Sequence, residues 1–140
     1  MKKQSWIQLG IGLVPIVLGF CCSLFPLPLF LTNLLFFVLW AWLCFRFSDI
    51  SLPLLPQLLR ICLPGAVVLG PALWADLAMV SLPSLLSIAT QFYFISGITM
   101  AGRILTPLLR IITAWPYYIV SYLCMSIVCL LAMILKRKIA

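Results

Sequence analysis

Residues 61–102 read ICLPGAVVLGPALWADLAMVSLPSLLSIATQFYFISGITMAG, and their only charged residue is Asp76. A helix needs about 20 apolar residues to cross the roughly 30 Å hydrocarbon core of a bilayer, so two spans fit into this stretch. Ser81-Leu82-Pro83 divides it, because proline lacks a backbone N–H and interrupts a helix. The stretch therefore predicts two membrane helices, over residues 61–80 and 84–102, joined by a tight turn.

The same alternation of apolar runs with basic or proline-containing borders continues on both sides of this stretch. It predicts further spans over residues 6–24, 29–45 and 115–135, and short interfacial helices within 46–60 and 103–114. The chain is thus expected to form one all-α, polytopic membrane domain over residues 1–140, with about five transmembrane helices. Four crossings are the alternative, because the third span would be broken at membrane depth by Pro64, Gly65, Gly70 and Pro71.

The composition agrees with a membrane location and excludes several classes of enzyme. The 140 residues are 66% hydrophobic and only 8% charged, whereas soluble domains carry about 25% charged residues. Asp49 and Asp76 are the only acidic residues, and histidine is absent. The usual acid–base pairs, histidine-based triads and histidine metal sites are therefore missing. We expect a non-enzymatic protein with no catalytic residues, no metal and no cofactor.

The tryptophans support the predicted borders. All five lie within about two turns of a predicted helix end, where amphipathic rings prefer to sit at the membrane interface: Trp6, Trp40, Trp42, Trp74 and Trp115.

The net charge of +7 comes from nine basic residues at the borders of the apolar runs. This spread is typical of topology signals and contact with lipid headgroups, and it argues against nucleic-acid binding. With five spans and a cytoplasmic N-terminus, six basic residues face the cytoplasm, while Lys136, Arg137 and Lys138 face outwards. Four spans would return these three to the cytoplasm. The compact chain and its short loops favour a bacterial cytoplasmic membrane.

Asp76 is the first candidate for function, because an ionisable residue inside a membrane segment is a functional-site hypothesis by default. It is predicted to bind a proton or cation along a transport pathway. The competing interpretation is structural. Asp76 lies about one turn from the predicted turn at residues 81–83, where its carboxylate could reach headgroup water or cap a backbone group.

The predicted fourth span carries polar and small residues at helical spacing. Ser84, Ser87 and Gln91 share one face, as steps of three and four residues require. In lipid such side chains bind neighbouring helices, and they can also line a polar pathway. The pairs Gly97/Ala101 and Ala66/Gly70 have the small-xxx-small spacing that lets two helices approach closely. The third and fourth spans are therefore predicted to face protein.

The adjacent thiols Cys21 and Cys22, followed by Pro26, form another candidate site. In these residues the first span resembles the small mercury-transport membrane proteins, in which paired thiols pass a soft cation along. The resemblance implies a thiol-based metal carrier, but the rest of the chain departs from that pattern. Cysteine is also a small apolar residue that is common in buried positions, so packing is the alternative role.

The leading functional hypothesis is a non-enzymatic integral membrane subunit of a transport, secretion or assembly complex. Its partners would be the lipid bilayer and other membrane subunits, or further copies of itself. The contacts to anionic lipid or a partner would come from arginines of the interfacial segments: Arg46, Arg60, Arg103 and Arg110. The alternatives are a small autonomous transporter or channel that uses Asp76 and the polar helix face, a thiol-based metal carrier, and a membrane-disrupting or immunity-type small protein.

Overall fold

The computed structural model describes residues 2–24, 28–109 and 114–139. Within these ranges the protein is all-helical, and each of its five helices is long and apolar enough to cross a membrane. The prediction of five such helices is therefore confirmed. Their bounds are α1 (Lys2–Leu24), α2 (Leu29–Phe47), α3 (Leu54–Ala78), α4 (Ser84–Leu109) and α5 (Trp115–Ile139).

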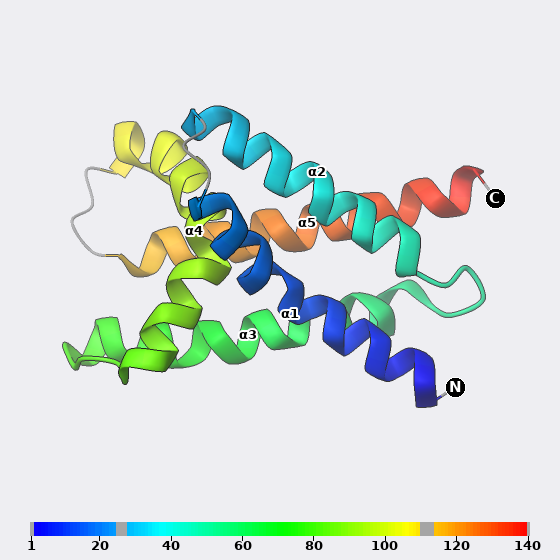
Figure 1. Ribbon diagram of the computed structural model, residues 1–140, viewed down its shortest axis with the longest axis horizontal. Helices are drawn as coiled ribbons and strands as arrows, with labels where there is room; N and C mark the ends of the chain where they lie inside the picture. Colours follow the sequence, from blue (N-terminus) through cyan, green and yellow to red (C-terminus); the bar gives the residue numbers. More distant parts are fainter. Residues whose placement is uncertain (1, 25–27, 110–113, 140) are drawn as a thin grey trace.

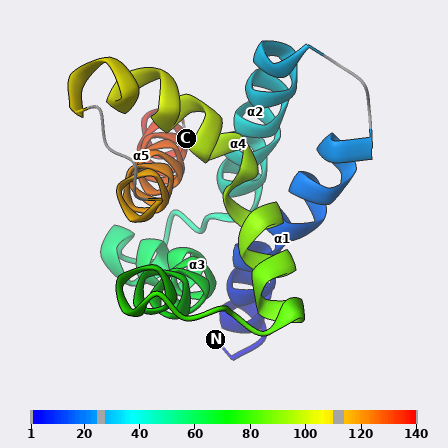
Figure 2. The ribbon, with the colours of Figure 1, turned by 90° about the vertical axis from the view of Figure 1, so that its left-hand side faces the viewer.

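Four of the helices run lengthwise through the molecule, and α4 runs across them (Figure 1). Figure 2 shows α3 and α5 nearly end-on, with α4 crossing in front. The N- and C-termini consequently lie at the same end, here called the terminal end, together with the loop of residues 48–53. The opposite or distal end holds α4, the last turn of α3 and the first turn of α5. A bundle of five parallel or antiparallel spans would have separated the termini.

Among the described residues, the predicted interfacial helices do not form separate elements. Residues 54–60 form the first turns of α3, and residues 103–109 continue α4, while 110–113 lie outside the described residues. A continuous helix pairs its own backbone groups, so an arginine at a membrane border does not require the helix to end there. The break near Pro64 and Pro71 on which the four-crossing alternative was based is absent, because α3 runs unbroken to Ala78.

Glycines mark the points where the helices approach most closely. A Cβ atom added at Gly12 would lie 2.7 Å from Pro64 Cγ of α3, and one at Gly19 would lie 2.8 Å from the carbonyl carbon of Phe92 in α4. At Gly97 the added atom would lie 2.6 Å from Ser121 Cβ of α5. Real Cβ atoms do not approach other atoms so closely, so these crossings depend on glycine.

The two predicted small-residue pairs behave differently. Gly97 and Ala101 are both buried, so this pair does face other helices, as predicted. Ala66 and Gly70 are exposed, and an added Cβ at Gly70 meets nothing within 4 Å. The α1 crossings at Gly12 and Gly19 are seven residues apart and do not follow the four-residue spacing used for the prediction.

The core receives side chains from all five helices, including Ile11 of α1 and Ile61 of α3. Trp40 is only 1% exposed, and its Nε1 donates a hydrogen bond to the carbonyl of Met125 at 3.1 Å. The Trp40 ring therefore packs between helices, because a partner for its indole N–H on α5 allows the ring to be buried. The other four tryptophans are partly or largely exposed. Other large buried side chains of this core come from α2, α4 and α5: Phe36, Tyr93, Phe94, Met125 and Met133.

Gln57 organises the terminal end. It is fully buried, and its Nε2 donates to the carbonyls of Asp49 (2.7 Å) and Leu52 (3.0 Å). Its Oε1 accepts hydrogen bonds from the Asp49 backbone N–H at 2.7 Å and from Gln8 Nε2 of α1 at 3.1 Å. The carboxamide of Gln57 thus forms hydrogen bonds with backbone groups of loop 48–53, and its bond to Gln8 joins this loop to α1.

Basic side chains of α5 complete this end. Lys136 Nζ donates to the carbonyl of Arg46 at 3.2 Å and also to that of Ser48, and Arg137 donates to the carbonyl of Leu52. The carbonyls of Arg46 and Ser48 belong to the C-terminal end of α2, where backbone acceptors are left unpaired and cations are favourable. These contacts hold the last turn of α5 against loop 48–53.

Replacing Gln57 with leucine is expected to destabilise the protein by roughly 3 kcal/mol, because the buried backbone groups of loop 48–53 lose their partners. In detergent this corresponds to a fall in Tm on the order of 10 °C, measured by tryptophan fluorescence. Gln91→Leu is the matched control, since Gln91 is also helical but exposed. Equal shifts in the two variants would contradict the role of Gln57.

Candidate functional site

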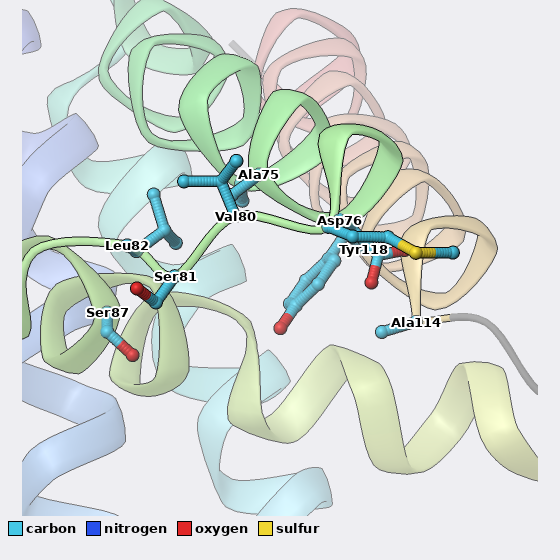
Figure 3. Close-up of a pocket in the computed structure, with 10 residues that line it drawn as sticks. Ala75, Asp76, Val80, Ser81, Leu82, Ser87, Ala114 and Tyr118 are labelled. Carbon is cyan, nitrogen blue, oxygen red and sulfur yellow. The ribbon is translucent and has the colours of Figure 1, made fainter.

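The candidate site is a pocket of about 570 Å³ at the distal end, between the end of α3 and the beginnings of α4 and α5 (Figure 3). Its polar lining comes from Asp76, Ser81, Ser87 and Tyr118. The remaining lining is mainly apolar, from Ala72, Ala75, Met79, Val80, Leu82 and Ala114. The pocket is therefore amphipathic, with one carboxylate and three hydroxyls set against an apolar wall.

The turn between α3 and α4 forms one wall of this pocket. Met79 ends α3 in the left-handed conformation, with φ 53° and ψ 36°, and its backbone N–H bonds to the carbonyl of Ala75. The Val80 N–H bonds to the same carbonyl at 3.0 Å. This reversal directs residues 80–82 back over the end of α3 and brings the first turn of α4 beside Asp76.

Asp76 is half-buried and links α3 to α5. Its Oδ2 accepts a hydrogen bond from the backbone N–H of Trp115 at 2.9 Å. Trp115 is the first residue of α5, where backbone N–H groups have no partner within the helix and a negative charge is favourable. The structural role considered for Asp76, a cap on a backbone group, is thus present. The capped group is 39 residues away in the sequence.

Replacing Asp76 with alanine is expected to cost about 1 kcal/mol of stability, because the α5 N-terminus loses an acceptor. Asp76→Asn keeps a carbonyl oxygen for the Trp115 N–H and should remain close to the unmodified protein. Thermal unfolding in detergent distinguishes the two variants. A loss of the same size in both would mean that the charge, and not the hydrogen bond, stabilises this end.

Tyr118 extends from the second turn of α5 into the space between α3 and α4 (Figure 3). Its ring packs edge-on against Phe94 of α4, with the ring centres 5.6 Å apart. Phe94 is fully buried, so Tyr118 connects the pocket to the core. Sequence reasoning missed Tyr118, because a tyrosine at the start of an apolar span has the pattern of an ordinary interfacial residue.

Only one of the three residues on the predicted polar face of α4 lines this pocket. Ser87 lines the pocket together with Asp76, but Ser84 and Gln91 are exposed. Among the described side chains of α4, the buried polar ones are instead Thr90 and Ser96. Thr90 Oγ1 donates to the carbonyl of Leu86 at 2.8 Å, within its own helix. The three predicted residues therefore do not line a common path.

The three described contact arginines do not all lie at one end of the molecule. Arg46 is exposed and Arg60 is half-buried, and both belong to the terminal end. Arg103 is exposed on α4, and Arg110 lies outside the described residues.

The vicinal thiols lie at the end of α1, where Cys21 is exposed and Cys22 is half-buried. Three other cysteines, Cys44, Cys62 and Cys129, come from different helices and are buried. Cys44 and Cys129 belong to the same buried core cluster. In the part of the chain that the structure describes, however, no group of three or more histidine, cysteine or acidic residues could hold a metal ion.

Comparison of the chain with protein-family models, with curated proteins and with solved structures finds no match.

Proposed function

We propose that the chain is an integral protein of a bacterial cytoplasmic membrane, crossed by α1, α2, α3 and α5, with both termini in the cytoplasm. The distribution of basic residues supports this orientation. Seven of the nine belong to the terminal end: Lys2, Lys3, Arg46, Arg60, Lys136, Arg137 and Lys138. Cytoplasmic borders of membrane proteins are enriched in lysine and arginine, and the cost of burying charge keeps these residues out of the hydrocarbon.

In this arrangement α4 lies across the outer end of the other helices. Its candidate span has a mean hydropathy of 1.3, against 1.7 to 2.4 for the other four. The lower value suits a helix near the interface, where exposed polar groups such as those of Ser84 and Gln91 reach water or headgroups.

Within the membrane we propose that the protein acts as a non-enzymatic subunit of a larger complex for transport, secretion or assembly. The supporting observation is how little of each helix the fold buries, since only 28–39% of the residues are buried in an apolar 18-residue stretch of each candidate span. Large apolar side chains remain exposed on all five helices, among them Leu13, Val38, Val67, Leu85 and Leu131. These faces are available to lipid and to the helices of partner subunits.

Extraction of a tagged chain from its native membrane in a mild detergent tests this proposal. Native mass spectrometry should find the chain together with other membrane proteins in fixed ratio. The control is an unrelated tagged protein of five apolar helices, expressed at the same level. A lone monomer with an activity of its own would contradict the proposal.

The pocket at Asp76 favours a second candidate, a small autonomous transporter. It combines a carboxylate inside a candidate span with hydroxyl groups from the α3–α4 turn, α4 and α5, as a polar binding site within a membrane requires. Liposomes that contain only this protein should then show solute flux that Asp76→Ala reduces. Absence of flux across a panel of ions and small cations would reject this candidate and leave the subunit proposal standing. The thiol-based carrier has less support, because only one of its two thiols is exposed.

A further inference from the structure

We propose that the distal pocket binds the ammonium group of a small amphipathic cation, with Asp76 as the counter-ion. The inference rests on the pocket described for the transporter candidate and names the class of ligand that it would take. It requires binding and does not require that the ligand be transported.

The charge of the pocket is the first argument. Asp76 contributes one negative charge, and among the described residues that line the pocket none is a lysine or arginine. The N-terminal ends of α4 and α5 each add about half a positive charge, and the C-terminal end of α3 adds about half a negative charge. The sum is about half a negative charge, which favours a cation. Most of the basic residues lie at the opposite, terminal end.

The hydrogen-bonding capacity of the pocket is the second argument. The cap on α5 uses only Oδ2 of Asp76, and among the described residues none donates a hydrogen bond to Oδ1. The hydroxyl oxygens of Ser81, Ser87 and Tyr118 are further acceptors in the lining. An ammonium group has three N–H donors and no acceptor, so it matches this set. The Tyr118 ring also offers a face that attracts cations.

The apolar wall is the third argument, because it favours an organic cation over an inorganic one. Ala72, Ala75 and Leu82 present methyl groups, and these offer nothing to a hydrated inorganic cation. They can pack against the hydrocarbon part of an organic amine. The volume of about 570 Å³ lies within the range of about 300–1,000 Å³ found for small-molecule sites.

The test is isothermal titration of the full chain in phosphatidylcholine nanodiscs with cyclohexylmethylamine, compared with the neutral and nearly isosteric cyclohexylmethanol. The amine should bind at least about tenfold more tightly than the alcohol. Asp76→Asn keeps the cap on α5 but removes the charge, so it should abolish this preference. Asp49→Asn is the matched control, since it removes the same charge at the terminal end, and it should leave the preference unchanged.

Equal binding of amine and alcohol, or an unchanged preference in Asp76→Asn, would overturn the inference. The ammonium group can belong to a free amine or to a phosphatidylethanolamine headgroup, and nanodiscs containing phosphatidylethanolamine distinguish these sources. Weaker amine binding in those discs would support the headgroup, and unchanged binding would support a free amine. Binding without flux in liposomes would leave the inference standing and reject transport. Flux that depends on Asp76, without preferential amine binding, would reject the inference and support transport.

Discussion

Alkaline phosphatase fused to the C-terminus is expected to be inactive, and green fluorescent protein fused there is expected to be fluorescent. The phosphatase folds only outside the cytoplasm, whereas the fluorescent protein matures inside it. Both results follow if α4 does not cross the membrane, because four crossings return the C-terminus to the side of the N-terminus. The expected ratio of the two reporter signals is at least tenfold.

The physical reason is the grouping of charges at the terminal end. Lys136 and Arg137 bind the carbonyls of Arg46, Ser48 and Leu52, so the end of α5 and the α2–α3 loop must lie on the same side of the membrane. A fifth crossing would separate these partners, and it would leave Lys136, Arg137 and Lys138 outside, against the usual bias of basic residues.

Two internal fusions calibrate the measurement. A reporter placed after Ile50, in loop 48–53, should match the C-terminal fusion, and one placed after Ser81, between α3 and α4, should give the opposite pattern. An active phosphatase at the C-terminus, together with an inactive one after Ile50, would show that α4 crosses the membrane. The transverse position of α4 would then be wrong for the protein in its bilayer.

Gly19→Ala is expected to destabilise the fold by about 3 kcal/mol or more, at the upper end of overpacking effects. The new methyl group would lie 2.8 Å from the carbonyl carbon and 3.2 Å from the Cα atom of Phe92. These are backbone atoms, so no rotation of a side chain relieves the contact, and α1 and α4 must move apart. The measurement is thermal unfolding in detergent, with an expected fall in Tm on the order of 10 °C.

Gly10→Ala provides the control within the same helix. A Cβ atom at Gly10 meets nothing within 4 Å, and alanine in a helix interior is more favourable than glycine by up to about 1 kcal/mol. Because both variants change the unfolded chain alike, their difference isolates the α1–α4 contact. If Gly10→Ala and Gly19→Ala change Tm equally, the close crossing of these helices does not exist in the folded protein.

Much of the fold could be predicted from local patterns. Apolar runs of bilayer length predicted five helices, and the run Ser81-Leu82-Pro83 correctly separated the third from the fourth. The ends of helices were predicted less well where arginine was read as a border. Arg60 and Arg103 lie inside α3 and α4, because the backbone hydrogen bonds of a helix continue past a charged side chain.

The candidate site could be predicted only in part. Asp76 stands out in the sequence as a charge in an apolar run, but its partner, the Trp115 N–H, carries no sequence signal. Ser87 reaches the same pocket, whereas Ser84 and Gln91 on the same predicted face do not. Helical periodicity states which residues share a face but not what that face meets.

The sequence by itself determined the helical class, the number of membrane-length helices and the position of basic residues at the borders of the apolar runs, because these depend on the composition of single segments. Only the tertiary structure decided that α4 runs across the other helices and that both termini share one end. It also decided that Gly19 meets Phe92 and that Asp76 caps α5. The sequence does not reveal which helices pack together, because lipid-facing and protein-facing positions are equally apolar. Helix pairing depends on shape and on contacts between residues that are distant in the sequence.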